Sequence, residues 1–137
     1  MRNHWRQSHL SARTAHQALA SGDTISAISR AYYAMFDATR AALAIIEPEL
    51  AVAKTHSTIL TRFSKHIIKE RGLDRKYSRM LRSTFELRTL TEYDEDPPTA
   101  ERASENLQKM DQFIAAVGQL FPDELGSHPE SDSEPNS

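Results

Sequence analysis

The sequence has no cysteine and only four glycines among its 137 residues. Without cysteine, the chain cannot form a disulfide, a thiolate metal site or a cysteine nucleophile. The glycines stand singly at positions 22, 72, 118 and 126, so the clustered glycines of a phosphate-cradling loop are missing. These absences exclude disulfide scaffolds, thiol catalysis and nucleotide-binding glycine loops.

Long apolar runs are also missing. Residues 41–46 form one of the longest, far below the roughly 18 residues that a membrane span needs. Residues 1–9 are polar and do not resemble a secretory signal, so we expect a cytoplasmic protein with no membrane segment. Hydrophobic residues make up 39% of the sequence, which is too much for a disordered chain and suits one folded domain.

Charge is unevenly distributed along the chain. The last sixteen residues carry five acids and no Lys or Arg, which leaves 17 basic and 14 acidic residues in residues 1–121. We expect a helical domain over residues 1–121 and a disordered acidic tail over residues 122–137. Within the domain, the stretch Lys54–Arg88 carries ten Lys or Arg against three acids.

Apolar residues recur every three or four positions, and no long stretch alternates with a period of two. This pattern predicts an all-α protein. Candidate caps and breaks (Asp23 or Thr24, Pro48, Gly72, Asp74, Pro97-Pro98 and Thr99) divide the chain into helices. Joined by short connections, these helices favour a five-helix antiparallel bundle. We expect them over about residues 3–20, 24–47, 55–71, 74–92 and 99–121.

The end of the fourth helix holds the first candidate site. Arg88 and Glu92 are four residues apart and therefore neighbours on a helix. Tyr93 lies about 140° away from Arg88 if the helix continues, and can swing back towards it if the helix frays. The alternative interpretation is a surface ion pair worth a few tenths of a kcal/mol, with Tyr93 packed at the helix end.

The basic stretch offers a second candidate site. Its functional interpretation is a surface that holds a phosphate backbone, with Tyr77 and Tyr93 available to stack on bases. The alternative is a set of solvated helix faces. No pair of helices shows the short glycine-containing turn of a DNA-binding helix-turn-helix. The candidate phosphate contacts are Lys54, Arg75, Lys76, Arg79 and Arg82.

The histidines do not predict a metal site. His56 and His66 are ten residues apart, and no H-E-x-x-H occurs, so we expect neither a metal nor another cofactor. His56 stands at the predicted start of the third helix. There a neutral imidazole can act as a general base, or it can serve only as a structural cap.

Five ordered motifs resemble those of small bacterial HEPN-domain proteins. They cover about residues 9–118 and are Ser29–Leu43 (SRAYYAMFDATRAAL), Lys54–Ser57 (KTHS), Phe63–His66 (FSKH), Phe85–Arg88 (FELR) and Glu92–Asp94 (EYD). The resemblance implies a bundle that forms a homodimer, with the arginine motifs of two subunits lining one cleft. It also implies a metal-independent ribonuclease, often a toxin neutralised by a minimal nucleotidyltransferase antitoxin.

The sequence departs from this family at one important place. The active family motif is an arginine followed closely by a histidine, but after Arg88 the next histidine is His128 in the tail. Tyr93 occupies the distal position, and a phenol with a pKa near 10 is a poor base at neutral pH. The resemblance therefore leaves two functions open: an RNA-cleaving enzyme using Arg88, Tyr93, Glu92 and His56, or a non-catalytic module that pairs with a nucleotidyltransferase.

The resemblance also suggests a partner-facing role for the acidic turn. Antitoxins of related proteins adenylylate a tyrosine near this motif, which makes Tyr93 a candidate for modification. Carboxylates repel phosphates, so the acids beside Tyr93 suit partner docking better than RNA binding. These acids are Glu92, Asp94, Glu95 and Asp96.

Overall fold

The computed structural model describes residues 1–93 and 96–126, and within these residues the chain is helical without strands. This confirms the predicted all-α bundle. The helices are α1 (Arg2–Ala20), α2 (Thr24–Ile46), the 3₁₀ turn η1 (Pro48–Ala51), α3 (His56–Arg62), the π-helical segment η2 (Phe63–Lys69), α4 (Arg75–Tyr93), α5 (Ala100–Leu120) and α6 (Pro122–Leu125).

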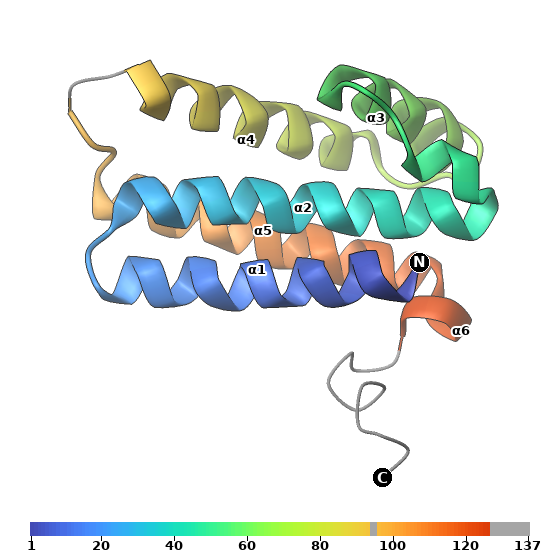
Figure 1. The fold of residues 1–137 in the computed structure, drawn as a ribbon, viewed down its shortest axis with the longest axis horizontal. Coiled ribbons are helices and arrows are strands. Elements are labelled where there is room, and N and C mark those ends of the chain that lie inside the picture. The colour runs from blue at the N-terminus through green and yellow to red at the C-terminus, as the bar shows by residue number, and fades with distance from the viewer. Residues whose placement is uncertain (94–95, 127–137) are drawn as a thin grey trace, which may run out of the picture.

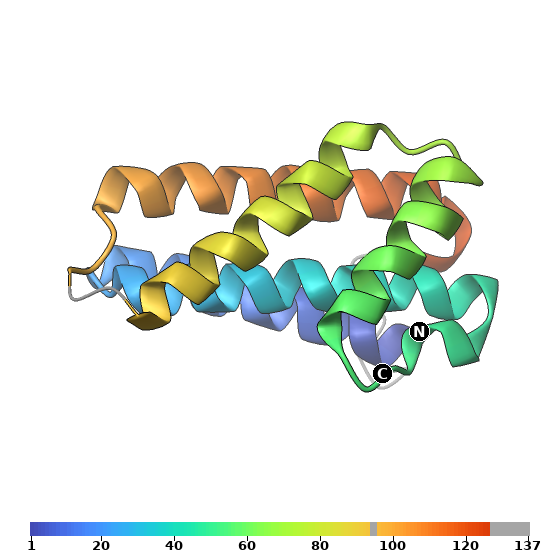
Figure 2. The same cartoon turned by 90° about the horizontal axis from the view of Figure 1, so that it is seen from above.

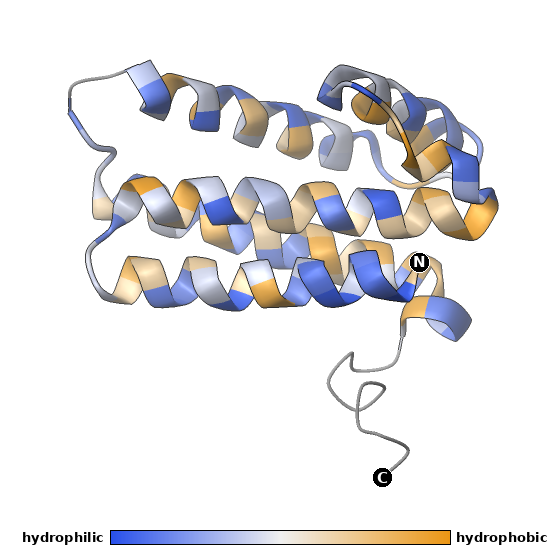
Figure 3. Cartoon of the chain, in the orientation of Figure 1, coloured by the Kyte–Doolittle hydropathy of each residue, from blue (hydrophilic) through white to orange (hydrophobic). Residues whose placement is uncertain are grey.

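The helices form two layers. Helices α1, α2 and α5 lie lengthwise beside one another, and α3, η2 and α4 form a second layer above them (Figure 1). Seen from above, α3 with η2 and α4 make a helical hairpin that runs obliquely over α2 and α5 (Figure 2). The helices of both layers carry hydrophobic residues interspersed with hydrophilic ones, as expected for amphipathic helices (Figure 3).

Helix α2 is the centre of the bundle. Thirteen of its 23 residues are buried, because it packs against α1, α5 and the hairpin at once. Many of these buried residues are alanines, whose small side chains let neighbouring helices approach closely. The hydroxyl of Ser8 on α1 donates to the carbonyl oxygen of Ala34 at 2.6 Å, which satisfies a buried polar group at this close contact.

The structure confirms the predicted caps Asp23 and Thr99 and adds Thr55 as the cap of α3. Asp23 accepts from the backbone N–H of residue 26, Thr55 from that of residue 58 and Thr99 from that of residue 102. Gly22 and Gly72 have φ angles of 86° and 80°, the left-handed region in which other residues are strained. Local chemistry therefore sets where these helices begin and end.

The third predicted helix differs from the expectation in its geometry. It is α-helical only as far as Arg62, and residues Phe63–Lys69 continue as a π-helix. The backbone N–H of Glu70 donates to the carbonyl of Lys65, five residues earlier, at 3.1 Å. Phe63 and Ile67, which lie in this segment, are both fully buried.

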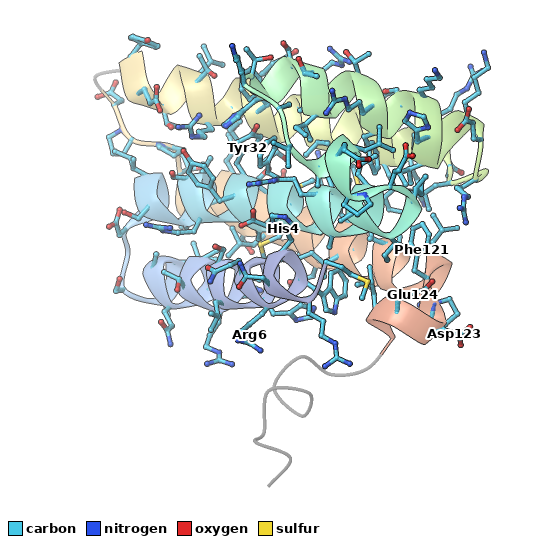
Figure 4. All side chains as sticks on the ribbon, turned by 45° about the vertical axis from the view of Figure 1, so that its right-hand side comes forward. His4, Arg6, Tyr32, Phe121, Asp123 and Glu124 are labelled. Atoms are coloured by element: carbon cyan, nitrogen blue, oxygen red, sulfur yellow. The ribbon has the colours of Figure 1, made fainter. Side chains whose placement is uncertain are left out.

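The folded domain extends beyond residue 121, which corrects the predicted start of the tail. Pro122–Leu125 form the short helix α6, and Leu125 is only 2% exposed. Leu125 is the one large apolar side chain in residues 122–137, and burying such a side chain stabilises the fold by about 1.5–3 kcal/mol. Figure 4 labels Phe121, Asp123 and Glu124 at this end of the bundle. The remaining predicted tail, residues 127–137, lies outside the described residues.

Candidate functional site

The candidate site lies where α4 crosses α2. Arg88 follows the buried residues Leu81 and Thr84 by seven and four positions, so it lies on the inward face of α4. Tyr32 on α2 is fully buried below it and lies between α2 and the hairpin (Figure 4). The predicted arginine therefore faces the interior of the bundle and not open solvent.

The guanidinium of Arg88 is held on two tyrosine rings. Its Cζ atom lies 5.4 Å from the ring centroid of Tyr32 and 5.0 Å from that of Tyr33. Its Nη2 atom donates to the Tyr33 hydroxyl at 2.8 Å and pairs with Oε1 of Glu92 at 3.2 Å. The side chain of Arg88 is 19% exposed, and its Nε atom is buried without a hydrogen-bond partner among the described residues.

The tertiary fold brings His56 into the same cluster. The imidazole lies 4.3 Å from the Phe36 ring and 6.4 Å from the Phe85 ring, measured between centroids. Its Nδ1 atom lies 2.9 Å from the hydroxyl oxygen of Tyr32. His56 is thus hydrogen-bonded to Tyr32, and the guanidinium of Arg88 lies over the ring of the same tyrosine.

The loop before α3 fixes the position of His56. Arg62 donates from Nη1 to the carbonyl oxygens of Leu50 at 3.0 Å and Val52 at 2.9 Å. Arg40 donates from Nε to the carbonyl of Ala51 at 3.1 Å. These two guanidinium groups hold the backbone that precedes α3. Arg62 belongs to the basic stretch, so part of the positive charge of that stretch is used in folding.

The hydrogen bond from Tyr32 assigns the protonation of His56. The Tyr32 hydroxyl is fully buried and Nδ1 of His56 is its hydrogen-bond partner, so a proton on Nδ1 would leave the phenol O–H without an acceptor. An unsatisfied buried donor costs about 1–3 kcal/mol. We therefore assign the phenol as donor to Nδ1, which leaves the neutral imidazole with its proton on Nε2.

Burial and charge favour the neutral forms of both groups. Burial lowers the pKa of His56, and the nearby positive charges of Arg88 and Arg40 lower it further. Burial also raises the pKa of Tyr32 well above its usual value, against a smaller opposing effect of Arg88. A neutral imidazole with Nε2–H and a guanidinium are both hydrogen-bond donors, and donors of this kind bind anions.

Glu92 and Tyr93 lie differently with respect to Arg88. Helix α4 continues through Tyr93, so Tyr93 lies about 140° from Arg88 around the helix and is 80% exposed. The structure does not bring these two residues together, and Tyr93 does not pack at the helix end. Glu92 is 49% exposed and forms the predicted ion pair. Of the acids that follow, Asp96 is exposed, while residues 94 and 95 lie outside the described residues.

The candidate phosphate contacts are scattered over the hairpin. Lys54 is exposed just before α3, and Arg82 is exposed midway along α4. Arg75 and Arg79 line a groove between η2 and α4. Lys76 instead places its ammonium nitrogen 5.2 Å from the Tyr77 ring centroid. The ring of Tyr77 packs edge-on against Phe113, with 6.2 Å between the ring centroids.

Sequence analysis did not identify every residue of the site. Tyr33 is a site residue that the sequence did not single out, although the Tyr32-Tyr33 pair falls inside the longest recognisable motif. In the part of the chain that the structure describes, no three His, Asp or Glu side chains converge to hold a metal ion. No helix there is both long and apolar enough to cross a bilayer.

Comparison with known proteins agrees with the predicted family resemblance. A family model described as HEPN domain matches residues 1–120 of the chain. The protein named "Putative toxin MJ0605" of Methanocaldococcus jannaschii is 28% identical over 93 residues, which cover 66% of this chain and 66% of that protein. The chain therefore matches just under two thirds of the length of this relative.

Proposed function

The chain belongs to the HEPN domain family, and on that premise we propose that it is a toxin-like protein that binds RNA at Arg88 and cleaves it without a metal ion. The observation that carries this proposal is the placement of Arg88. Its guanidinium is fixed on Tyr32 and Tyr33, close to the neutral imidazole of His56. A preorganised cation of this kind stabilises charge that develops on a phosphate.

Each of these residues, together with Glu92, would have a different role in RNA cleavage. Arg88 and the Nε2–H of His56 would donate hydrogen bonds to the oxygens of the reacting phosphate. Glu92, whose carboxylate is paired with Arg88, is the candidate base that accepts the 2′-hydroxyl proton as the 2′-oxygen attacks phosphorus. His56 is less suited to be that base, because its Nδ1 atom accepts the Tyr32 hydroxyl and its Nε2 atom carries the proton.

Cleavage is tested by incubating the purified protein with total RNA in EDTA. We expect wild-type protein to degrade RNA, Arg88→Ala to be inactive, and Glu92→Gln to lose most activity while still binding RNA. Arg6→Ala, which changes an exposed arginine on α1, is the control and should match wild type. Expression of Arg88→Ala in cells should also be harmless. If that variant remained fully toxic, the assignment of the site would be wrong.

A second candidate function is a non-catalytic module that pairs with a minimal nucleotidyltransferase. The exposure of Tyr93 favours it, because an accessible phenol at a helix end can receive a nucleotidyl group. Incubation with such an enzyme and ATP should add one adenylyl mass to wild type and none to Tyr93→Phe. RNA left intact at high protein concentration, combined with this modification, would favour the module over the nuclease.

We also propose that the active form is a homodimer. One Arg88, one His56 and one Glu92 supply a cation, a donor and a base, but no separate acid for the leaving 5′-oxygen. A second copy facing the first would bring a second His56, whose Nε2–H can protonate the leaving 5′-oxygen as its bond to phosphorus breaks. Sedimentation at micromolar concentration should give a dimer, and a strict monomer would count against this arrangement.

A further inference from the structure

A groove of about 720 Å³ runs between η2 and the first half of α4. It lies between the two arms of the hairpin seen in Figure 2, and its volume falls in the range of roughly 300–1,000 Å³ usual for small-molecule sites. Eight residues line it: Ser64, Ile68, Lys69, Leu73, Asp74, Arg75, Ser78 and Arg79.

The π-helical geometry of η2 builds one wall of this groove. In a π-helix, hydrogen bonds join residues five apart, so residues five positions apart lie roughly above one another. Ser64 and Lys69 are five apart and both line the groove, together with Ile68. In an α-helix, Lys69 would lie about 140° away from Ser64. Local widening of this kind often marks functional sites.

The lining combines an apolar floor with a positively charged rim. Ile68 and Leu73 pack against the core and present apolar surface. Three of the charged lining residues are cations, Lys69, Arg75 and Arg79, and their side chains are exposed. Asp74 is the single acid in the lining, and its carboxylate already accepts the backbone N–H of Lys76 at 2.9 Å.

Two hydroxyl groups meet across the groove. The Oγ atoms of Ser64 on η2 and Ser78 on α4 lie 3.1 Å apart. Each hydroxyl can both donate and accept a hydrogen bond, so either can exchange its partner for the polar edge of a ligand. An apolar floor, paired hydroxyls and a cationic rim match the base, the base edge and the phosphate of a nucleotide.

We propose that this groove holds a base and phosphate of single-stranded RNA, a few nucleotides from the phosphate bound at Arg88. This inference rests on the proposed function and extends it to substrate class. Single strands fit because their unstacked bases can reach a floor such as Ile68 and Leu73, whereas the bases of a duplex stay stacked. The Cα atoms of Arg79 and Arg88 are separated by about 14 Å of helix rise, and the two residues lie about 180° apart around α4, so an RNA strand that joins the two sites passes round this helix.

The proposal is tested by photocrosslinking the full-length protein to decamer RNAs that carry 4-thiouridine at successive positions. We expect one position, distinct from the cleavage site, to crosslink to residues within 64–79. The double variant Arg75→Glu, Arg79→Glu should weaken binding roughly tenfold and reduce the salt-dependence slope by roughly 1.4, at about 0.7 per lost contact. Arg2→Glu, Arg6→Glu is the matched control, because these two arginines are also exposed and four apart on a helix.

A second variant blocks the groove without changing charge. Ser78→Phe removes one of the paired hydroxyls and should fill the groove and abolish the crosslink. Normal binding by Arg75→Glu, Arg79→Glu, with crosslinks only elsewhere and binding still lost in Arg88→Ala, would overturn the groove proposal and leave the proposed function standing. Failure of wild-type protein to bind any RNA would overturn both. Binding of a synthetic acidic peptide in that case would identify the groove as a protein-docking surface.

Discussion

The interface between α1, α2 and α5 differs in chemistry from the interface between α2 and the overlying hairpin. The first is filled by alanines and aliphatic or aromatic side chains, among which Ser8 and Thr39 satisfy their hydroxyls on backbone carbonyls. The second contains Tyr32, His56 and Arg88, a linked set of polar and charged groups. Apolar packing stabilises the first interface. At the second interface, polar and charged side chains that can take part in chemistry replace some of the apolar packing.

This difference in chemistry explains why the candidate site lies under the hairpin. Burying a guanidinium is costly unless its charge and donors are satisfied. Two ring faces, the Tyr33 hydroxyl and a carboxylate offset this cost for Arg88. Among the described residues the buried Nε atom of Arg88 has no hydrogen-bond partner, so this compensation is incomplete.

The largest expected loss of stability follows from a substitution where the two layers meet. The ring of Phe113 on α5 is fully buried, 5.5 Å from Phe63 in η2 and 6.2 Å from Tyr77 in α4. Phe113→Ala should lower the free energy of unfolding by about 3–5 kcal/mol, because it leaves a cavity that joins both layers. Urea denaturation measures this loss. The neighbouring exposed residue offers the control Gln112→Ala, and equal losses in both variants would refute this account of the interface.

A smaller effect is expected for the polar interface. Tyr32→Phe removes the hydrogen bond to His56 and keeps the ring, so it should lower the free energy of unfolding by about 0.5–1.5 kcal/mol. It should also reduce RNA cleavage, because the imidazole loses its orientation. Tyr77→Phe is the control, since no hydrogen bond to its hydroxyl is found among the described residues. A larger stability loss for Tyr77→Phe would contradict the role given to the Tyr32 hydroxyl.

The smallest expected effect concerns the pH dependence of stability. The pKa of His56 is lowered in the folded state, so below its ordinary value of 6.5 the unfolded chain binds a proton more readily than the folded one. The stabilisation from His56 is therefore present above about pH 6.5 and is lost as the pH falls. Thermal unfolding between pH 7.5 and pH 5 should show a steeper decline for wild type than for His56→Asn.

The same shift can be measured directly. Arg88→Met removes a nearby positive charge, so the pKa of His56 in that variant should rise towards its ordinary value in an NMR titration. Arg6→Met, which removes a distant exposed charge on α1, is the control. An unchanged His56 pKa in Arg88→Met would mean that the two groups are not electrostatically coupled.

Much of the fold could be predicted because its signals are local. Apolar spacing, the caps at Asp23, Thr55 and Thr99 and the turns at Gly22 and Gly72 each act within a few residues. The π-helical turn was not predictable from apolar spacing, because Phe63 and Ile67 are four residues apart and lie on one face of an ordinary α-helix as well. The docking of Leu125 depends on a distant apolar surface.

The candidate site was predictable only in part. The motif identifies Arg88, and the four-residue spacing identifies its pairing with Glu92, because both follow from helix geometry. Whether Tyr93 would turn back to Arg88 depended on whether the helix ends at Glu92, and α4 continues through Tyr93.

By itself, the sequence determined the helices, their caps and the family, since these depend on residues close together in the chain. Only the tertiary structure decided that His56 joins Arg88 across 32 positions of sequence, through a buried tyrosine on a third helix. The physical reason is that a hydrogen bond, a ring contact and a shifted pKa depend on distances in space. Only the packing of the hairpin on α2 fixes those distances.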